Sequence, residues 1–403
     1  MQTAAAVDVI AAGKGAGPML AAFMAAAPCP VRRAIGMAAE AAPALPPGVR
    51  WHRTAHPVPD ERSVAAAREA LEVAAAAGAD DLLLVLLSGG ASSIAALPVE
   101  GVTLADKQRT SAQLLSLGAE IQDLNTVRKH LSGIKGGRLA AAHAGGTVTL
   151  ALSDVVGDDL SSIGSGPTVP DPTTYTDALA ALDRYGGRAA FPVAVVDHLV
   201  RGAGGGVSDT PKPGDPRLAR STATVIGGIR TAMHGARAAA ESLGYVVHVI
   251  DKPITGEASV AAGDLLEQVE RVLRLGSHAS PPSPADRLCF ISGGETTVRT
   301  AGSGKGGRNQ EFALALARGL DHLGRRVVAA SVGTDGVDGP TDAAGAIVDS
   351  TTIQRASDAG AGEIERYLRA HDSYLFFDQL GDLIRTGPTG TNVGDLQVLL
   401  AGP

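Results

Sequence analysis

Short apolar runs rich in β-branched residues recur along the chain, and most of them end in a glycine or acidic turn. Alanine-rich stretches of helical character usually follow these turns. A repeated order of strand, turn and helix predicts βαβ units, so we expect an α/β fold. The predicted strands lie at 7–10, 82–87, 147–152, 223–226, 245–250, 288–291 and 327–332, and helices are expected after Pro18, at 229–243 and at 312–320.

The chain is long enough for two domains, because its 403 residues exceed what one ordinary hydrophobic core accommodates. Residues 202–217 (GAGGGVSDTPKPGDPR) are rich in glycine and proline and show no hydrophobic period. We interpret them as an exposed connection between an N-terminal domain, 1–205, and a C-terminal domain, 218–403. A long loop inside one domain is the alternative.

Composition narrows the classes of partner and compartment. The formal net charge of −7 gives no field that would attract nucleic acid or an anionic membrane, so an anionic substrate must be held by local charges. Cys29 and Cys289 lie far apart and match no metal-binding spacing, which favours a reducing compartment. Since the sequence has neither a membrane-spanning apolar run nor a basic start before an apolar stretch, we expect a cytoplasmic protein.

The turns that follow the predicted strands carry the polar motifs, and open α/β sheets bind ligands beyond the carboxyl ends of their strands. Only seven of the 35 basic residues are lysines, yet Lys14, Lys135 and Lys305 all stand near glycines. An ammonium group beside backbone N–H groups is a common arrangement for holding phosphate. Ordinary small-residue turns are the alternative. The candidate phosphate or substrate ligands are Gly13, Lys14, Ser88, Gly89, Gly90, Ser92, Ser93, Gly164, Ser165, Gly166 and Thr168.

These glycine turns differ from the common nucleotide and hydrolase motifs. The spacing G-x-x-x-x-G-K-[ST] occurs neither at 88–93 nor at 302–305, which argues against a Walker-type NTPase. The string G-x-S-x-G is also missing at 88–93, which argues against a hydrolase nucleophile elbow. After the first strand the glycines are misspaced for a dinucleotide fingerprint, and we identify no acidic residue that ends a second strand about 20 residues later.

Charged residues near other turns are further candidates. Arg128 and Lys135 belong to the densest basic stretch, although solvated charges at a helix end usually explain such a run. Arg308 and Asn309 open a predicted helix, where a guanidinium group can grip phosphate oxygens in a bidentate way. Aspartates in turns offer the oxygen ligands that Mg²⁺ prefers, with solvated loop residues as the default interpretation. The metal candidates are Asp154, Asp158, Asp335 and Asp338, and Asn392 is a polar candidate near the C-terminus.

Several long motifs together resemble one known family. They are AGKGAGPM, HPVPD, SGGASS, DLNTVRKHLSGIKGGRLA, LSDVVGDDLSSIGSGPTVPDPTTY, SGGETTV, GKGGRNQE, GTDGVDGPTDAAGAIVD and TGPTGTNVGDLQ. Over nearly the whole chain the sequence is similar to the class II glycerate 2-kinases, whose C-terminal portion is called the MOFRL domain. Family members usually carry a helical segment before their first strand, whereas here that strand begins at residue 7, which a shortened or misassigned start would explain. They also often have glycine where this chain has Ala91.

The resemblance implies a larger Rossmann-like N-terminal domain and a smaller C-terminal α/β domain that includes a MOFRL region at about 285–400, with the active site in the cleft between them. It also implies ATP and Mg²⁺ as cosubstrates, and Lys14 with Arg308 as the catalytic pair. On this basis we expect a glycerate 2-kinase that phosphorylates the C2 hydroxyl of D-glycerate and gives 2-phosphoglycerate and ADP.

Two other functions remain open at this point. An NAD(P)H-dependent hydroxypyruvate reductase is the first, since relatives of the family often carry that label. A binding protein that senses a phosphorylated metabolite without turnover is the second. In each case the expected partners are small molecules, with neither nucleic acid nor membrane, and a homodimer is a further possibility.

Overall fold

The computed structural model describes residues 6–275, 286–298, 304–323 and 325–402. Gly302 and Ser303 of the lysine-containing turn at 302–305 lie outside the described residues. The chain forms two compact units. Unit 1 comprises Met1–Leu152 and Gly157–Ile226, and unit 2 comprises Ser153–Val156 and Gly227–Pro403. The polypeptide therefore passes from one unit to the other three times, and each unit is described by itself below.

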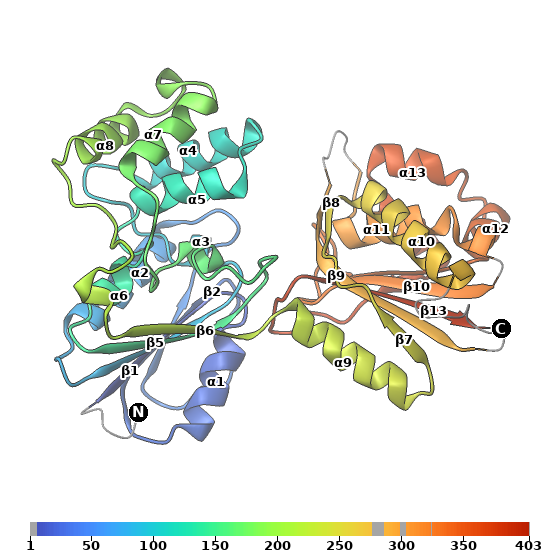
Figure 1. Cartoon of the computed structure of the whole chain (residues 1–403), viewed down its shortest axis with the longest axis horizontal. Coiled ribbons are helices and arrows are strands. Elements are labelled where there is room, and N and C mark those ends of the chain that lie inside the picture. Colours follow the sequence, from blue (N-terminus) through green and yellow to red (C-terminus); the bar gives the residue numbers. More distant parts are fainter. Residues whose placement is uncertain (1–5, 276–285, 299–303, 324, 403) are drawn as a thin grey trace. The chain divides into compact units, whose positions relative to one another are not determined.

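Unit 1 is built on a six-stranded sheet with the strand order β3-β2-β1-β4-β5-β6 (Figure 1). The pairings from β3 to β5 are all parallel. This is the strand order of the dinucleotide-binding Rossmann fold, and the order reverses between β1 and β4. The Rossmann-like expectation for this half of the chain is thus confirmed. Its strands are β1 (Val7–Ala12), β2 (Val31–Ala38), β3 (Val49–Arg53), β4 (Leu82–Leu87), β5 (Gly146–Leu152) and β6 (Ser221–Gly227).

The two central strands of unit 1 are apolar without alternation, apart from the buried Asp8 of β1, because helices cover both of their faces. β1 and β4 are buried along nearly their whole length. Ala16 and Leu20 of α1 pack with Val9 of β1 in one hydrophobic cluster on one face. α2 contacts the other face. The helices of unit 1 are α1 (Ala16–Ala26), α2 (Glu61–Ala75), α3 (Ala91–Ile94), α4 (Leu104–Ser116), α5 (Ile121–His130), α6 (Arg138–Ala141), α7 (Tyr175–Arg184) and α8 (Val193–Ala203), with 3-10 turns at Ile163–Ser165, Arg188–Ala190 and Pro216–Leu218.

Four helices of unit 1, α4, α5, α7 and α8, gather into a separate cluster beyond the sheet (Figure 1). They share a hydrophobic core of their own, to which Leu114, Leu124, Leu182 and Leu199 contribute. This helical cluster and the sheet belong to the same compact unit. It brings α4 and α5 to the side of the sheet on which the turns after β4 and β5 lie (Figure 1).

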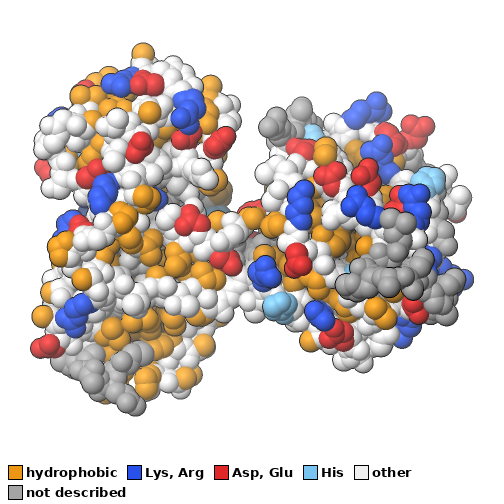
Figure 2. All heavy atoms as spheres, in the orientation of Figure 1, with side chains coloured by type: hydrophobic (Ala, Val, Ile, Leu, Met, Phe, Trp, Pro, Cys, Tyr) orange, Lys and Arg blue, Asp and Glu red, His pale blue; other side chains and the backbone are white. Residues whose placement is uncertain are grey.

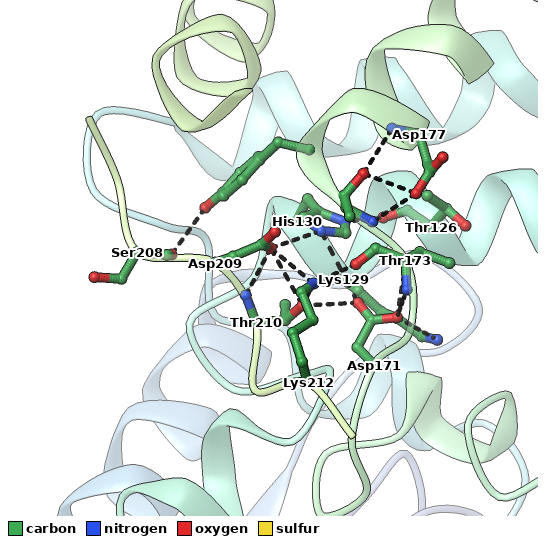
Figure 3. A network of polar contacts seen from close by, with 12 residues as sticks. Thr126, Lys129, His130, Asp171, Thr173, Asp177, Ser208, Asp209, Thr210 and Lys212 are labelled. Carbon is green, nitrogen blue, oxygen red and sulfur yellow. Dashed lines mark hydrogen bonds and ion pairs between the residues drawn. The ribbon is translucent and has the colours of Figure 1, made fainter. Parts of the chain in front are cut away.

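The segment 202–217 packs onto unit 1 and does not lead into unit 2. His130 Nε2 lies 3.0 Å from Asp209 Oδ1, and Thr210 Oγ1 donates to Asp171 Oδ2 at 3.0 Å. Lys212 bonds the carbonyl of Thr173, and Figure 3 shows these groups meeting in one network. Since β6 then joins the first sheet, unit 1 runs to Ile226, beyond the boundary at 205–218 that we expected from the sequence.

Unit 2 contains a seven-stranded mixed sheet in the order β12-β11-β10-β13-β9-β7, with β8 pairing β9. Its pairings from β12 to β9 are antiparallel, whereas β7 and β8 pair β9 in parallel. The repeated βαβ units expected here are therefore wrong for most of this sheet. Its strands are β7 (Val246–Val249), β8 (Ile254–Glu257), β9 (Leu288–Thr297), β10 (Arg326–Gly333), β11 (Gly345–Asp349), β12 (Leu383–Ile384) and β13 (Asp395–Gly402).

Helices cover both faces of the second sheet (Figure 1). α9 packs against one face through Met233 and Ala240, and α10 and α11 build the main core on the other with Phe290 and Phe312. The helices are α9 (Ile229–Ser242), α10 (Ala258–Leu275), α11 (Arg308–Ala317), α12 (Thr352–Asp358), α13 (Ile364–Ala370) and α14 (Ser373–Leu380), with a 3-10 turn at Leu320–Leu323.

The SGGETT motif at 292–297 lies inside β9. From the sequence we expected it to form a turn after the strand predicted at 288–291. Both of its glycines are in close contact with neighbouring segments. A Cβ on Gly294 would lie 2.0 Å from the carbonyl oxygen of Ile254, and one on Gly293 would lie 2.4 Å from Ile229. These glycines allow β8 and α9 to approach β9 closely. They belong to a strand and not to a ligand-binding loop.

The surface carries charges of both signs. Figure 2 shows Lys, Arg, Asp and Glu side chains interspersed on the visible face of each unit, without a broad area of one sign. Among the described residues, no helix has the length and apolar character needed to cross a membrane.

Candidate functional site

The turns after β1 and β4 interlock where the strand order of unit 1 reverses. The Lys14 N–H donates to the carbonyl of Gly89 at 2.9 Å, and the Gly15 N–H donates to Ser88 Oγ at 2.8 Å. Gly13 has a φ of +122°, and a Cβ there would lie 2.3 Å from Ser88 Oγ. Only glycine fits this contact. In open α/β sheets this crevice is where ligands bind, and here Lys14 stands at the start of α1.

A second group of predicted residues meets just beyond the β4 turn. Ser92 Oγ and Ser165 Oγ are 3.0 Å apart, and Ser165 Oγ donates to Asn125 Oδ1 at 3.2 Å. Lys135 is 1% exposed, and its ammonium donates to the carbonyls of Ser92, Ala95 and Gly164 at 2.8 to 3.4 Å. Burial, with the charges of Lys107 and Arg128 nearby, lowers its pKa well below the usual value. The ammonium of Lys135 thus fixes α3 against the 163–166 turn.

Gly166 and Thr168 support this turn from inside. Gly166 has a φ of +60°, and its carbonyl accepts the N–H of Gly137 at 2.7 Å. Thr168 is 2% exposed, and its hydroxyl accepts a hydrogen bond from Thr149 Oγ1 at 2.7 Å. These two predicted ligands have structural partners that account for them.

A cavity of about 360 Å³ opens beside Ser92 and Ser93, wholly within unit 1. The walls come from the 57–59 loop, α3, α4 and α5. Lys107, Arg109, Arg128 and Lys135 contribute to the lining, and none of the described residues that line the cavity carries a carboxylate. Burial, followed by the charge of Arg128, lowers the pKa of Lys107 to about 7, and burial also lowers the pKa of Arg128. Four basic side chains therefore face a cavity in which burial opposes the charge of three of them.

In unit 2, Arg308 and Asn309 begin α11 and converge on one buried carboxylate. Arg308 donates to Asp395 through Nε at 2.6 Å and through an Nη atom at 2.9 Å, and Asn309 Nδ2 donates to Asp395 Oδ1 at 2.8 Å. Asp395 is fully buried at the start of β13, while the Arg308 side chain is 33% exposed. Burial opposes the charge of Arg308, but its hydrogen bonds to Asp395 outweigh burial and raise its pKa.

Asp338 caps the N-terminus of α11. Its two oxygens accept the backbone N–H groups of Asn309 at 3.1 Å and Gln310 at 2.8 Å. Burial raises the pKa of this carboxyl to about 6, against the effect of those two hydrogen bonds. A carboxylate whose oxygens both serve a helix end is poorly suited to hold a metal ion.

The other metal candidates are divided between the two units. Asp154 Oδ2 accepts from Asn392 Nδ2 at 2.9 Å, and Asp335 Oδ1 accepts the N–H of Val337 at 3.1 Å, both in unit 2. Asp158 belongs to unit 1. Within 6–275, 286–298, 304–323 and 325–402, no three His, Cys, Asp or Glu side chains form a metal-binding group.

Comparison with known proteins identifies the family. Residues 1–200 match the family described as "Domain of unknown function (DUF4147)", and residues 288–395 match the "MOFRL family". The chain is 40% identical over 346 residues to glycerate 2-kinase of Pyrococcus horikoshii, which covers 86% of this chain and 76% of that protein. The chain belongs to the glycerate kinase family.

Two further comparisons add to this assignment. The crystal structure of glycerate kinase from Thermotoga maritima matches with a TM-score of 0.84 and 36% identity, over 98% of this chain and 91% of that one. A protein of Agrobacterium vitis, named as a candidate hydroxypyruvate reductase, is 40% identical over 98% of this chain and 87% of its own length. Glycerate kinase relatives therefore match in sequence and in fold.

Several residues of this glycerate kinase family member were missed by the sequence reasoning. Lys107 lies in a helix without glycines, although the scarcity of lysine in the chain could have drawn attention to it. Asp395 follows the C-terminal polar turn and shows its role only through its contacts with α11. Lys305 was noted for its glycines, but its ammonium lies 3.9 Å from the centre of the Tyr374 ring.

Gly13→Ala tests the interlock of the two turns. The added Cβ overlaps Ser88 and the backbone must keep a positive φ, so we expect a loss of stability on the order of 3 kcal/mol or more. Gly48→Ala is the matched control, because Gly48 has a φ of +89° with open space around it and should cost only about 1–2 kcal/mol. Thermal unfolding of both variants measures the difference, and equal losses would contradict the overlap.

Asp395→Asn tests the support of Arg308. Removing the buried partner of a half-exposed guanidinium should destabilise unit 2 by about 1–3 kcal/mol. Glu295→Gln is the control, since Glu295 is 43% exposed and 3.5 Å from Arg308 and should cost less than about 1 kcal/mol. Denaturant unfolding is the measurement, and an Asp395→Asn variant as stable as the control would refute the assigned role.

Asp338→Asn tests the titration of the α11 cap. Because the pKa of Asp338 lies near 6 in the folded protein and near 4 when unfolded, the folded state holds more protons between these values. Stability from this group therefore falls as pH rises from about 4 to 6, by about 3 kcal/mol, and asparagine removes this fall.

Unfolding free energies of wild type and Asp338→Asn, measured from pH 4 to 7, should diverge in favour of the variant. Asp342→Asn is the control, because hydrogen bonds from Tyr374 lower the pKa of Asp342 and move its titration below this range. A difference between wild type and Asp338→Asn that stays constant with pH would show that Asp338 does not titrate there.

Proposed function

We propose that this chain is a glycerate 2-kinase that transfers the γ-phosphoryl group of ATP to the C2 hydroxyl of D-glycerate. The observation that carries the proposal is the interlocked pair of turns at the β1/β4 switch point, with Lys14 at the start of α1, in a member of the glycerate kinase family. The names of the relatives in Pyrococcus horikoshii and Thermotoga maritima support the acceptor and the reaction.

Phosphoryl transfer asks a protein chiefly for positioning and for neutralisation of charge on the transferring group. In the proposed reaction the C2 oxygen of glycerate bonds to the γ-phosphorus, the bond from that phosphorus to the β–γ bridging oxygen breaks, and ADP leaves. Lys14 supplies an ammonium beside the N-terminus of α1. Arg308, held at one end by Asp395, supplies a planar set of donors suited to phosphate oxygens.

Mg²⁺ bound to the ATP phosphates would neutralise further charge. It usually takes one or two carboxylates plus substrate phosphates, so it needs no cluster of three protein ligands. Both oxygens of Asp338 already accept backbone N–H groups as a helix cap, so we propose Asp154, Asp158 and Asp335 as the carboxylates. A cytoplasmic location and a homodimer are parts of the same proposal.

A hydroxypyruvate reductase is the second candidate, because one relative carries that name and the sheet has the Rossmann strand order. Contrary to the sequence expectation, an acidic residue does follow the second strand: β2 ends at Ala38, and the exposed Glu40 comes two residues later. The spacing of Gly13, Gly15 and Gly17 still differs from a dinucleotide fingerprint. Oxidation of NADH or NADPH that depends on hydroxypyruvate would favour this candidate.

Phosphorus NMR of the products from D-glycerate and ATP tests the proposed function directly. We expect 2-phosphoglycerate and ADP. Formation of 3-phosphoglycerate would refute the C2 assignment, and consumption of neither substrate would refute the kinase.

Lys14→Ala and Arg308→Ala test the proposed catalytic pair. Each should lower kcat by about 10²-fold or more, because each removes a preorganised charge from the transferring group. The controls are Lys252→Ala and Arg318→Ala, two exposed cations of unit 2. Initial rates of ADP release measure the effect, and normal turnover in both active-site variants would show that the pair is wrongly assigned.

A further inference from the structure

We propose that the cavity beside Ser92 and Ser93 binds the carboxylate of the acceptor substrate, with Arg128 as its counter-ion. This inference rests on the proposed glycerate kinase activity. It adds that Arg128 makes the enzyme prefer an acid to a neutral polyol as the acceptor. All of its parts lie in unit 1.

The location of the cavity fits an acceptor site. Ser92 and Ser93 stand on α3, directly after the Ser88–Gly90 turn that receives the Lys14 N–H. A small acid bound at α3 would therefore lie a short distance along the chain from the turn at which we place phosphoryl transfer. A volume of about 360 Å³ accommodates a three-carbon acid with bound water.

We assign the ligand to Arg128 because the other three basic side chains of the lining already have partners. Arg109 pairs with Asp106 at 2.5 Å, Lys107 donates to the carbonyl of Leu131 at 3.3 Å, and Lys135 donates to three carbonyls. Arg128, by contrast, has no hydrogen bond or ion pair with any residue that the structure describes. Its guanidinium is half-buried at the end of α5.

An unpaired, half-buried cation beside two buried ammonium-bearing side chains is costly without an anion. Burial removes water from the charge, and the lining offers no carboxylate that would compensate. A carboxylate ligand would accept two parallel hydrogen bonds from the guanidinium fork of Arg128. The Ser93 hydroxyl, which also has no partner among the described residues, offers a further donor.

The side chains around this charged end are largely apolar. Pro57, Val58, Pro59, Ala112 and Leu115 form much of the remaining wall. Such a wall excludes bulk water from the ion pair and strengthens it. A neutral molecule of the same size gains nothing from Arg128, so the cavity should discriminate between glycerate and glycerol by the carboxylate.

Steady-state kinetics of Arg128→Ala tests the proposal. We expect KM for D-glycerate to rise by about 10²-fold, as for truncation of one partner of a buried charge pair. KM for ATP should stay within about twofold of wild type, and the low kcat/KM for glycerol as a neutral acceptor should not fall. Arg68→Ala, an exposed arginine on α2 of the same unit, serves as the control and should match wild type throughout.

The folded stability of the variant separates a ligand-binding arginine from a structural one. Removing Arg128 relieves its repulsion with Lys107 and Lys135, so Tm of Arg128→Ala should equal or exceed that of wild type. Arg128→Lys keeps the charge but loses the fork, and it should raise KM for D-glycerate by about tenfold. This second variant keeps the test decisive even if Arg128→Ala does not fold.

Three outcomes would overturn the inference. Wild-type KM for D-glycerate in both variants would show that the carboxylate binds elsewhere. A rise confined to KM for ATP would assign the anion to a nucleotide phosphate. Equal losses of kcat/KM with glycerate and with glycerol would show that Arg128 has a structural role. Failure of the wild-type protein to phosphorylate glycerate at all would instead refute the proposed function.

Discussion

The close contact between Gly13 and Ser88 determines how the functional part of unit 1 is built. Parallel strands β1 and β4 pair side by side, so their following turns must leave the sheet within a few ångströms of each other. Glycine at residue 13 and a small hydroxyl side chain at residue 88 allow those turns to hydrogen-bond directly. This contact fixes Lys14 beside the turn that leads into α3.

Lys14 and Arg308, the proposed catalytic pair, stand near helix starts of different character. In unit 1, Lys14 directly precedes the N-cap of α1, whose first turn has no acidic residue to offset the positive end of the helix dipole. In unit 2, Asp338 already satisfies the first amides of α11, and its negative charge offsets the helix dipole. An anion in unit 2 would therefore be held by the Arg308 side chain and not by the helix end.

Periodicity predicted β1, β4, β5, β6, β7, β9 and β10, because their sequences are apolar runs that end in turns, but it missed β2, β3, β8, β11, β12 and β13. It could not predict the pairing direction in unit 2, since apolar runs such as 288–291 and 327–332 read alike in parallel and antiparallel sheets. The glycines of SGGETT were taken for a turn because close backbone packing and tight turns both select glycine. Composition marked the segment 202–217 as irregular, but it is a loop of unit 1 and not the expected connection between domains, and composition did not reveal the polar network that holds it to α5.

The site was predictable where a residue type is rare in its context and not where its role depends on a distant partner. Lys14 stands out among glycines and Arg128 in a dense basic stretch, whereas Lys107 and Asp395 acquire meaning only from partners that are distant in the sequence. The capping role of Asp338 could not be predicted from the sequence, because a loop aspartate and a helix cap have the same sequence appearance.

The excursion of residues 153–156 into unit 2 has a practical consequence for dissecting the protein. Ser153 N–H donates to Gly227 at 2.8 Å, and Asp154 accepts from Asn392, so four residues from the middle of the N-terminal half complete the C-terminal unit. Cutting the gene once, at 226/227, would leave the second fragment without this piece. Expression of unit 2 on its own would require a fusion or a circular permutation that restores it.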